Sequence, residues 1–389
     1  MSELLFKWID AHKEPYIEMA DYIFDHPELG NQEFEAMKLL TDQLKAIGFE
    51  VEVGIAGLET AFKAVYRKGT GQPNIGLLCE YDALEGLGHA CGHHMQGPSI
   101  VLAAEAIVNH VQADNFQITV YGTPAEETTH GKLRMLEQDY MKELDVALMM
   151  HGSPTTTTDI KSLALTNLEV TFLGKSAHAA LKPEDGRSAF DALLLAFNGT
   201  EFLREHVRED VKMHYTMLET TGPANVVPAR ARAKFSLRSY SRAYLNEVEA
   251  RVENVLKGAA MMAGVECEIN WGDRLNNKIP ALKLNELLME KAQLAGAPRI
   301  SPPREKTGSS DFSNVMYEVP GSCIRVAFVP VGTSSHSQAF LDNGKTEEGH
   351  VAIEMAAKVL SAASIDLITQ PDYLAEIKAE FDQNKATMQ

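Results

Sequence analysis

Short apolar segments alternate with helical ones along residues 49–165, and this alternation constrains the fold more than any other feature. Five segments have the length and apolar content of strands: FEVEVGI, ETAFKAVYR, NIGLLCEY, FQITVYGTP and DVALMMHG. The later ones are separated by two segments with helical spacing of apolar residues, SIVLAAEAIVNHV and LRMLEQDYMKEL. Strands that alternate with helices favour βαβ units, so we predict an α/β fold with a mostly parallel sheet flanked by helices.

The pattern changes near residue 166 and returns near residue 276. In between, LEVTFLGKSAHAA and ARAKFSLRSY alternate as half-exposed strands, and two long segments read as amphipathic helices, SAFDALLLAFNGTEFLREHV and YLNEVEARVENVLKGAAMMAGV. The chain of 389 residues is long enough for two domains. We therefore predict a catalytic domain in two parts, 1–165 and 276–389, interrupted by an inserted α+β domain, 166–275.

Charge and cysteine content narrow the possible partners and compartment. With 36 basic and 54 acidic residues, the formal net charge is −18, which repels phosphate backbones and anionic lipids. We expect no nucleic acid and no membrane partner. The N-terminus lacks the pattern of a signal peptide, and the four cysteines are too widely spaced for a disulfide framework, so we expect a cytoplasmic protein.

Residues that can bind a metal follow four of the predicted strands. Asp82 and a Cys/His-rich loop follow NIGLLCEY, Glu126 and Glu127 follow FQITVYGTP, His151 follows DVALMM, and His336 follows CIRVAFVPVGTSS. In open parallel sheets, sites form beyond the carboxyl ends of the strands. Each residue alone has a commoner structural role, but their shared position predicts a metal centre.

The loop GHACGHHMQG, residues 88–97, carries the strongest metal signal. Cys91 and His93 are separated by a glycine, so an irregular loop can direct a thiolate and an imidazole to the same place. This pair suits zinc and other divalent transition metals. The candidate set of one thiolate, one carboxylate and three imidazoles fits one zinc, or two ions that share a bridging ligand. The ligands are scattered along the chain, which is typical of a catalytic rather than a structural site.

Eight motifs along the chain resemble those of the dimetal aminoacylase/carboxypeptidase metallopeptidases: HACGHH, GTPAEE, MMHG, GKSAHAA, ANVVPARA, SLRS, GSSDFSNV and the late HS. They are most similar to the amidohydrolase subgroup that includes hippurate hydrolase, indole-acetyl-amino acid hydrolases and p-aminobenzoyl-glutamate hydrolase. The similarity runs in order over nearly the whole chain. It implies a metal-dependent exopeptidase-like catalytic domain, a ferredoxin-like lid and dimerisation domain, and a homodimer or higher homo-oligomer.

The resemblance also implies the parts of the catalytic centre. Two divalent ions per subunit, zinc or manganese with cobalt or nickel as alternatives, would be held by Cys91, His93, Glu127, His151 and His336, with Cys91 as the bridge. Glu126 is implied as the general base for attack by metal-bound hydroxide. Asp82 is implied to orient a ligand imidazole.

Four further residues are implied to act on the substrate. His178 in KSAHAA matches a histidine that reaches a neighbouring active site and helps to polarise the scissile carbonyl, although a strand-end imidazole at a dimer surface is an alternative. Asn225 and Arg238 resemble residues that hold the substrate carboxylate, which suits the planar fork of arginine. An arginine on an exposed strand is the alternative for Arg238. Ser309, in the segment 308–314, is expected to line the pocket.

Two positions depart from the family pattern. Glu80 stands where much of the family has a metal-binding histidine, so we expect His93 or His151 to compensate. His94 stands where the subgroup has an aspartate, and we expect it to be structural or to face the substrate rather than to bind metal. His89 is expected to be structural.

These features predict a metal-dependent amidohydrolase that cleaves N-acyl amino acids. The main alternative is a dipeptidase acting on Xaa-basic or β-alanyl dipeptides. A thiol hydrolase with Cys91 as the nucleophile would leave Glu127, His151 and His336 without a role. A metal-bound binding protein without catalysis would have no need for Glu126.

Overall fold

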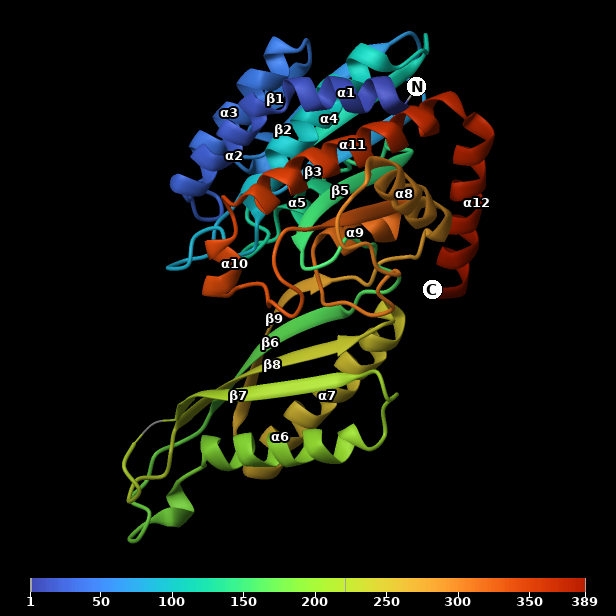
Figure 1. Ribbon diagram of the computed structural model, residues 1–389. Helices are drawn as coiled ribbons and strands as arrows, with labels where there is room; N and C mark the ends of the chain where they lie inside the picture. Colours follow the sequence, from blue (N-terminus) through green and yellow to red (C-terminus); the bar gives the residue numbers. More distant parts are fainter. Residues whose placement is uncertain (1, 221, 389) are drawn as a thin grey trace. The chain divides into compact units, whose positions relative to one another are not determined.

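The structure is a computed structural model that describes residues 2–220 and 222–388 (Figure 1). It consists of two compact units. Ser162–Asn277 forms the second unit, and the flanking segments up to Lys161 and from Lys278 to Thr387 form the first. The inserted domain was predicted over 166–275. Both limits of the second unit lie just outside that range: its first strand already begins at Ala164, and two residues follow the end of its last strand at Leu275.

A six-stranded sheet forms the centre of the first unit, with the order β1-β2-β4-β3-β5-β10. β3 is parallel to β4 and β5, and β5 is parallel to β10, whereas β2 runs antiparallel to both of its neighbours. The strands are β1 (Glu50–Val53), β2 (Phe62–Lys68), β3 (Asn74–Cys79), β4 (Phe116–Gly122), β5 (Val146–Ser153) and β10 (Gly321–Ala327). This is the predicted mostly parallel sheet.

Both faces of the central strands are buried, as expected when a parallel sheet is covered by helices on each side. Leu77 and Leu148 belong to one hydrophobic cluster, while their chain neighbours Leu78 and Met149 belong to another. Figure 1 shows α4 and α11 crossing the sheet on the larger cluster's side. The helices of this unit are α1 (Ser2–His12), α2 (Glu14–Asp25), α3 (Phe34–Ala46), α4 (Gln96–His110), α5 (Gly131–Glu137), α8 (Leu282–Ala295), α9 (Phe312–Glu318), α10 (Gln338–Asp342), α11 (Glu347–Thr369) and α12 (Pro371–Met388).

One predicted helix is shorter than its periodicity suggested. LRMLEQDYMKEL indicated a helix over residues 133–144, but α5 ends at Glu137. Asp139 then adopts a left-handed backbone conformation with φ of 59°, which no α-helix can contain. The remaining residues form turns that lead into β5, so the connection is a short helix followed by a loop.

The second unit is a four-stranded antiparallel sheet with two helices on one face (Figure 1). Its elements are β6 (Ala164–Leu173), α6 (Ala189–Arg204), β7 (Lys212–Thr220), β8 (Arg230–Ser239), α7 (Arg242–Ala263) and β9 (Glu266–Leu275), with the strand order β7-β8-β6-β9. Ser188 and Ser241 cap the two helices, accepting hydrogen bonds from backbone N–H groups three residues on. The sequence pattern missed β7 and β9, because these edge strands are largely exposed and polar.

None of the described helices combines the length and the apolar character needed to cross a bilayer.

Candidate metal centre

Four strands deliver metal-capable residues to one end of the central sheet. Glu80 and Asp82 follow β3, Glu127 lies beyond β4, and His336 lies beyond β10. His151 was expected to follow its strand, but β5 continues to Ser153, so His151 lies inside the strand near its end. Because β3, β4, β5 and β10 run parallel, these side chains lie at the same edge of the sheet.

The Cys/His loop turns sharply at its glycine. Gly92 has φ of 81° and precedes the short 3₁₀ helix η2 (His93–Met95). This left-handed conformation costs glycine little and other residues more. Cys91 and His93 are both buried, at 8% and 1% exposure. The turn lets both side chains point inward, as the sequence predicted.

All five expected ligands come together in two groups of three. Cys91, His93 and His151 form one group, and within it the Cys91 Sγ lies 3.6 Å from His151 Nε2. A second group contains Cys91, Glu127 and His336, with Glu127 Oε1 3.1 Å from His336 Nε2. Within each group the donor atoms lie no more than 4.8 Å apart. Cys91 belongs to both groups, which is the position of a ligand that bridges two ions.

The chemistry of these side chains fits divalent metal ions. His93 Nε2 and Glu127 Oε1 are buried without a hydrogen-bond partner among the described residues, although each lies near another donor atom of the centre. Burial raises the pKa of the Cys91 thiol to about 12, so a thiolate at this position needs a cation beside it. Burial lowers the pKa of His151 to about 3, which leaves a neutral imidazole with a lone pair for a metal.

Asp82 holds two parts of the centre at once. Its Oδ1 lies 3.0 Å from His93 Nδ1, and its Oδ2 accepts a hydrogen bond of 2.9 Å from the backbone N–H of Glu127. A proton on Nδ1 leaves the lone pair of His93 on Nε2, which faces the other ligands. This geometry is what an imidazole-orienting carboxylate requires.

Glu126 lies between the ligand groups and is positioned by a strained turn. Its nearest donor oxygen is within 4.8 Å of donor atoms of His93 and Glu127. The preceding residue, Ala125, has φ of 59° and donates its N–H to Glu33 Oε1 at 2.8 Å. Burial raises the pKa of Glu126 well above its ordinary value. A carboxylate with raised proton affinity beside these candidate ligands can act as a general base.

Sequence reasoning missed a buried ion network beside Glu126. The Lys132 Nζ lies 2.5 Å from Glu80 Oε1 and 2.7 Å from Asp311 Oδ1. Glu80 Oε2 lies 3.3 Å from His93 Nε2, so the network touches the centre. No sequence signal pointed to Lys132, because the predicted helix began one residue after it; only the structure places it in the first turn of α5, where the helix dipole disfavours a positive charge. Asp311 lies in the segment 308–314, which was expected to line the pocket, but the named residue there was Ser309 and no role was predicted for the aspartate.

The two extra histidines of the loop stay outside the ligand groups. His94 Nε2 donates to the Gly344 carbonyl at 3.0 Å, and its ring packs edge-on against Phe24. Burial lowers the pKa of His94 to about 4. The His89 ring is also buried, 5.4 Å from that of His94. Both side chains are therefore buried outside the ligand groups, where they stabilise the loop.

In the second unit, two of the predicted substrate residues are neighbours and the third lies elsewhere. His178 pairs with Val226 in an antiparallel bridge, and the Asn225 carbonyl accepts a 3.0 Å hydrogen bond from Ala179. Arg238 lies near the far end of β8, about 26 Å from its first residue at ~3.3 Å per residue. The structure thus brings together His178 and Asn225 but not Arg238.

Ser309 lies in the first unit, in the segment that leads to α9. Its Oγ is buried without a hydrogen-bond partner among the described residues. Asp311, two residues later, accepts from the backbone N–H of Lys132 at 3.3 Å. This contact joins the serine-rich segment to the ion network beside Glu126.

A cavity of about 610 Å³ opens at Glu127 and His336, two of the candidate ligands. Its wall contains apolar side chains such as Leu29 and Leu87, the hydroxyls of Thr128 and Thr129, and the exposed carboxylate of Glu85. Among the described residues that line it, none is a lysine or an arginine. The cavity can therefore take a neutral or cationic part of a substrate next to the centre.

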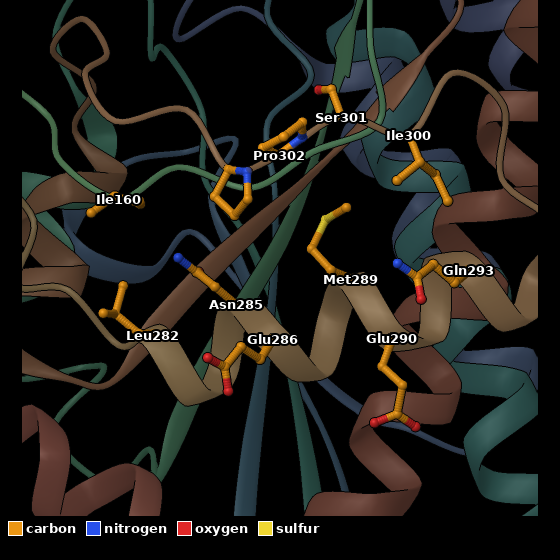
Figure 2. A pocket seen from close by; sticks show the side chains of 11 residues that line it. Ile160, Leu282, Asn285, Glu286, Met289, Glu290, Gln293, Ile300, Ser301 and Pro302 are labelled. Atoms are coloured by element: carbon orange, nitrogen blue, oxygen red, sulfur yellow. The ribbon is translucent and has the colours of Figure 1, made fainter.

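A second cavity, of about 630 Å³, lies over α8. Figure 2 shows Met289 directed from the helix toward Ser301 and Pro302, while the carboxylate of Glu290 points away. Its described lining contains no histidine or cysteine. This cavity holds none of the predicted site residues.

Comparisons with known proteins agree with this geometry. Residues 72–362 match the model of peptidase family M20/M25/M40. A p-aminobenzoyl-glutamate hydrolase chain of Escherichia coli (strain K12) is 29% identical, over 96% of this chain and 93% of that protein. The Xaa-Arg dipeptidase of Homo sapiens is 28% identical, over 96% of this chain and 90% of that protein.

Solved structures show the same fold. A putative aminohydrolase from methicillin resistant Staphylococcus aureus superimposes with a TM-score of 0.79 at 20% identity, covering 95% of this chain and all of that one. The Bacillus subtilis YXEP protein, a dinuclear metal binding peptidase, has a TM-score of 0.71 at 20% identity, covering 91% of this chain and 98% of that one. The predicted fold class and resemblance are confirmed. The chain belongs to peptidase family M20/M25/M40 and is a hydrolase that acts on C–N amide bonds.

Proposed function

We propose that this chain hydrolyses the amide bond of small N-acyl amino acids at a centre of two divalent metal ions, with Glu126 as the general base. The observation that carries the proposal is the membership of Cys91 in both ligand groups. One thiolate shared by two sets of imidazole and carboxylate donors suits a pair of ions better than a single one. The printed names of the relatives, which include a hydrolase of p-aminobenzoyl-glutamate and one of hippurate, support the substrate class.

When bound, the ions supply Lewis-acid polarisation of the scissile carbonyl and lower the pKa of a coordinated water. The residues of the chain orient the ligands and transfer the proton. Asp82 keeps His93 in the tautomer that presents Nε2. The Glu126 carboxylate accepts a proton from the attacking water and returns it to the nitrogen of the leaving amine, which the raised pKa of its buried carboxyl favours.

A homodimer is part of the proposal, and the positions of the proposed substrate residues support it. His178 is proposed to polarise the scissile carbonyl, and Asn225 and Arg238 to hold the substrate carboxylate, with Ser309 at the pocket wall. His178 and Asn225 lie beyond the start of β8, and Arg238 lies near its end, about 26 Å along the strand. One small substrate cannot touch both ends within a single subunit. This separation supports a homodimer in which a second copy of the chain supplies one of them.

The thiolate ligand favours zinc, while the carboxylates also suit manganese, and cobalt or nickel are alternatives. All four cysteines are free, which is usual for a protein of a reducing compartment, so we propose the cytoplasm as its location.

A dipeptidase acting on Xaa-basic or β-alanyl dipeptides is the second candidate. The cavity beside Glu127 and His336 contains the Glu85 carboxylate and no cationic side chain among its described lining. That charge favours a cationic group on the substrate. The similarity to Xaa-Arg dipeptidases points in the same direction.

The test combines one variant with a substrate panel. Glu126→Gln should keep the metal content of the wild type and lose turnover by about 10²- to 10⁴-fold, since it removes only the proton acceptor. Hippurate, p-aminobenzoyl-glutamate and β-alanyl-lysine are compared side by side, with metal content measured by elemental analysis. Activity that survives thorough metal removal would refute the metal mechanism. Preference for β-alanyl-lysine would select the dipeptidase.

A further inference from the structure

Lys132 is a fully buried cation in an unfavourable place. It lies in the first turn of α5, where the helix dipole disfavours positive charge, and its side chain has no exposed surface. Its Nζ contacts two buried carboxylates, Glu80 at 2.5 Å and Asp311 at 2.7 Å. Buried charges are retained only when they are paired, so the three groups depend on one another.

The carboxylates around Lys132 form a third group of potential metal ligands. Oxygens of Glu80, Glu126 and Asp311 lie within 4.8 Å of one another. An all-carboxylate set suits hard divalent ions such as Mn²⁺ or Mg²⁺. The Lys132 ammonium contacts two of these three carboxylates directly and so supplies beside them the positive charge that such an ion would bring.

The charge state of Lys132 fits this role. Burial by itself lowers the pKa of a lysine, but the charges of Asp311 and Glu80 outweigh it and raise the pKa of Lys132 above its ordinary value. The side chain is therefore an ammonium at neutral pH.

Keeping a metal away from these carboxylates matters because Glu126 is one of them. A general base needs an oxygen with a free lone pair, and a carboxylate bound to a metal is a much weaker proton acceptor. Glu127, the adjacent residue, is a proposed ligand, and its donor oxygen lies within 4.8 Å of an oxygen of Glu126. The centre therefore needs a group that keeps metal binding at Glu127 apart from proton transfer at Glu126.

We propose that the Lys132 ammonium is a built-in counter-ion that excludes divalent metal from the carboxylates of Glu80, Glu126 and Asp311 and so leaves Glu126 free to accept a proton. Lys132 is a positioning residue in this account, since it acts through Glu126. The inference depends on the proposed function only for the role of Glu126. Metal exclusion itself is independent of the substrate.

The experiment counts metal ions in Lys132 variants. The wild type is dialysed against Mn²⁺ in parallel with Lys132→Met and Lys132→Arg. Bound manganese per chain is then measured by inductively coupled plasma mass spectrometry. Lys132→Met should bind one more Mn²⁺ per chain than the wild type, because a neutral side chain of similar length leaves three carboxylates uncompensated. Lys132→Arg keeps the positive charge and should bind the wild-type number.

The double variant Lys132→Met/Asp311→Asn identifies the added site. It should lose the additional Mn²⁺, because only two of the three carboxylates remain. In Lys132→Met, rising Mn²⁺ concentration should also lower kcat with KM unchanged, whereas the wild type should show no such inhibition. A residue that merely held α5 in place would change neither the Mn²⁺ count nor this kinetic pattern.

Each remaining outcome either supports or overturns the proposed role of Lys132. A folded Lys132→Met with the wild-type Mn²⁺ count overturns the proposal, and so does an extra ion in Lys132→Arg or in the double variant. If Lys132→Met folds only when Mn²⁺ is present and then holds the additional ion, the proposal is supported. If it stays unfolded in millimolar Mn²⁺, the proposal fails, since the ion should replace the lost ammonium. A wild type inactive on every substrate would refute the proposed function and leave the Mn²⁺ counts unaffected.

Discussion

Asp82→Asn tests whether the centre depends on the carboxylate that joins two of its proposed ligands, His93 and Glu127. Both oxygens of Asp82 accept hydrogen bonds, one from His93 Nδ1 at 3.0 Å and one from the Glu127 N–H at 2.9 Å. The side chain is buried, so water cannot replace either bond. An asparagine of the same shape has only one oxygen, and its NH₂ group must face a donor whichever way the amide is turned.

The size of the effect follows from the lost bond. A hydrogen bond to a charged acceptor contributes about 1.5–3 kcal/mol. At about 1.4 kcal/mol per tenfold change, this corresponds to roughly 10- to 150-fold in affinity. The loss falls on the metal-bound state, because only that state requires the proton on Nδ1 and the lone pair on Nε2 of His93. Changing a residue that supports a metal ligand typically costs about 10- to 100-fold in metal affinity, which is the same range.

Competition with a fluorescent zinc chelator measures the affinity directly. The matched control is Asp21→Asn, which removes a second aspartate–histidine pair outside the centre: Asp21 Oδ1 also lies 3.0 Å from His350 Nε2. The control should bind zinc like the wild type. Asp82→Asn with an affinity within twofold of the wild type, and an unchanged circular dichroism spectrum, would refute the reasoning.

Two further predictions concern the loop and the pH dependence of stability. Gly92→Ala should destabilise the loop by about 1–2 kcal/mol, because φ of 81° is left-handed and the added methyl would lie 3.0 Å from the Met95 side chain. Thermal melting and zinc titration measure this loss. A melting temperature equal to that of the wild type would contradict the prediction. Burial lowers the pKa of Lys278 from 10.5 to about 8. At a pH between these two pKa values, the unfolded chain binds a proton that the folded protein lacks, so the free energy of unfolding rises with pH across that window. Lys278→Met should remove this rise, which urea denaturation at both ends of the window would detect; an equal rise in the variant would show that Lys278 is not its source.

Local patterns were sufficient for most of the first unit and for the placement of its candidate ligands. The strands over NIGLLCEY, FQITVYGTP and DVALMMHG were predictable because both faces of a parallel strand are buried, which produces continuous apolar runs. The rule that sites form at the carboxyl ends of such strands then brought Glu127, His151 and His336 to one edge. β7 and β9 were missed because an exposed edge strand needs few apolar residues.

The residue types at each strand end, and thereby the metal chemistry, were determined by the sequence alone, because strand periodicity and ligand chemistry are properties of short segments. Only the tertiary structure decided which charges meet. Lys132 pairs with Asp311 across 179 positions and with Glu80 across 52. Such a pairing leaves no local pattern, since the energy of a buried ion pair depends on distance and desolvation in the folded protein rather than on neighbours in the chain.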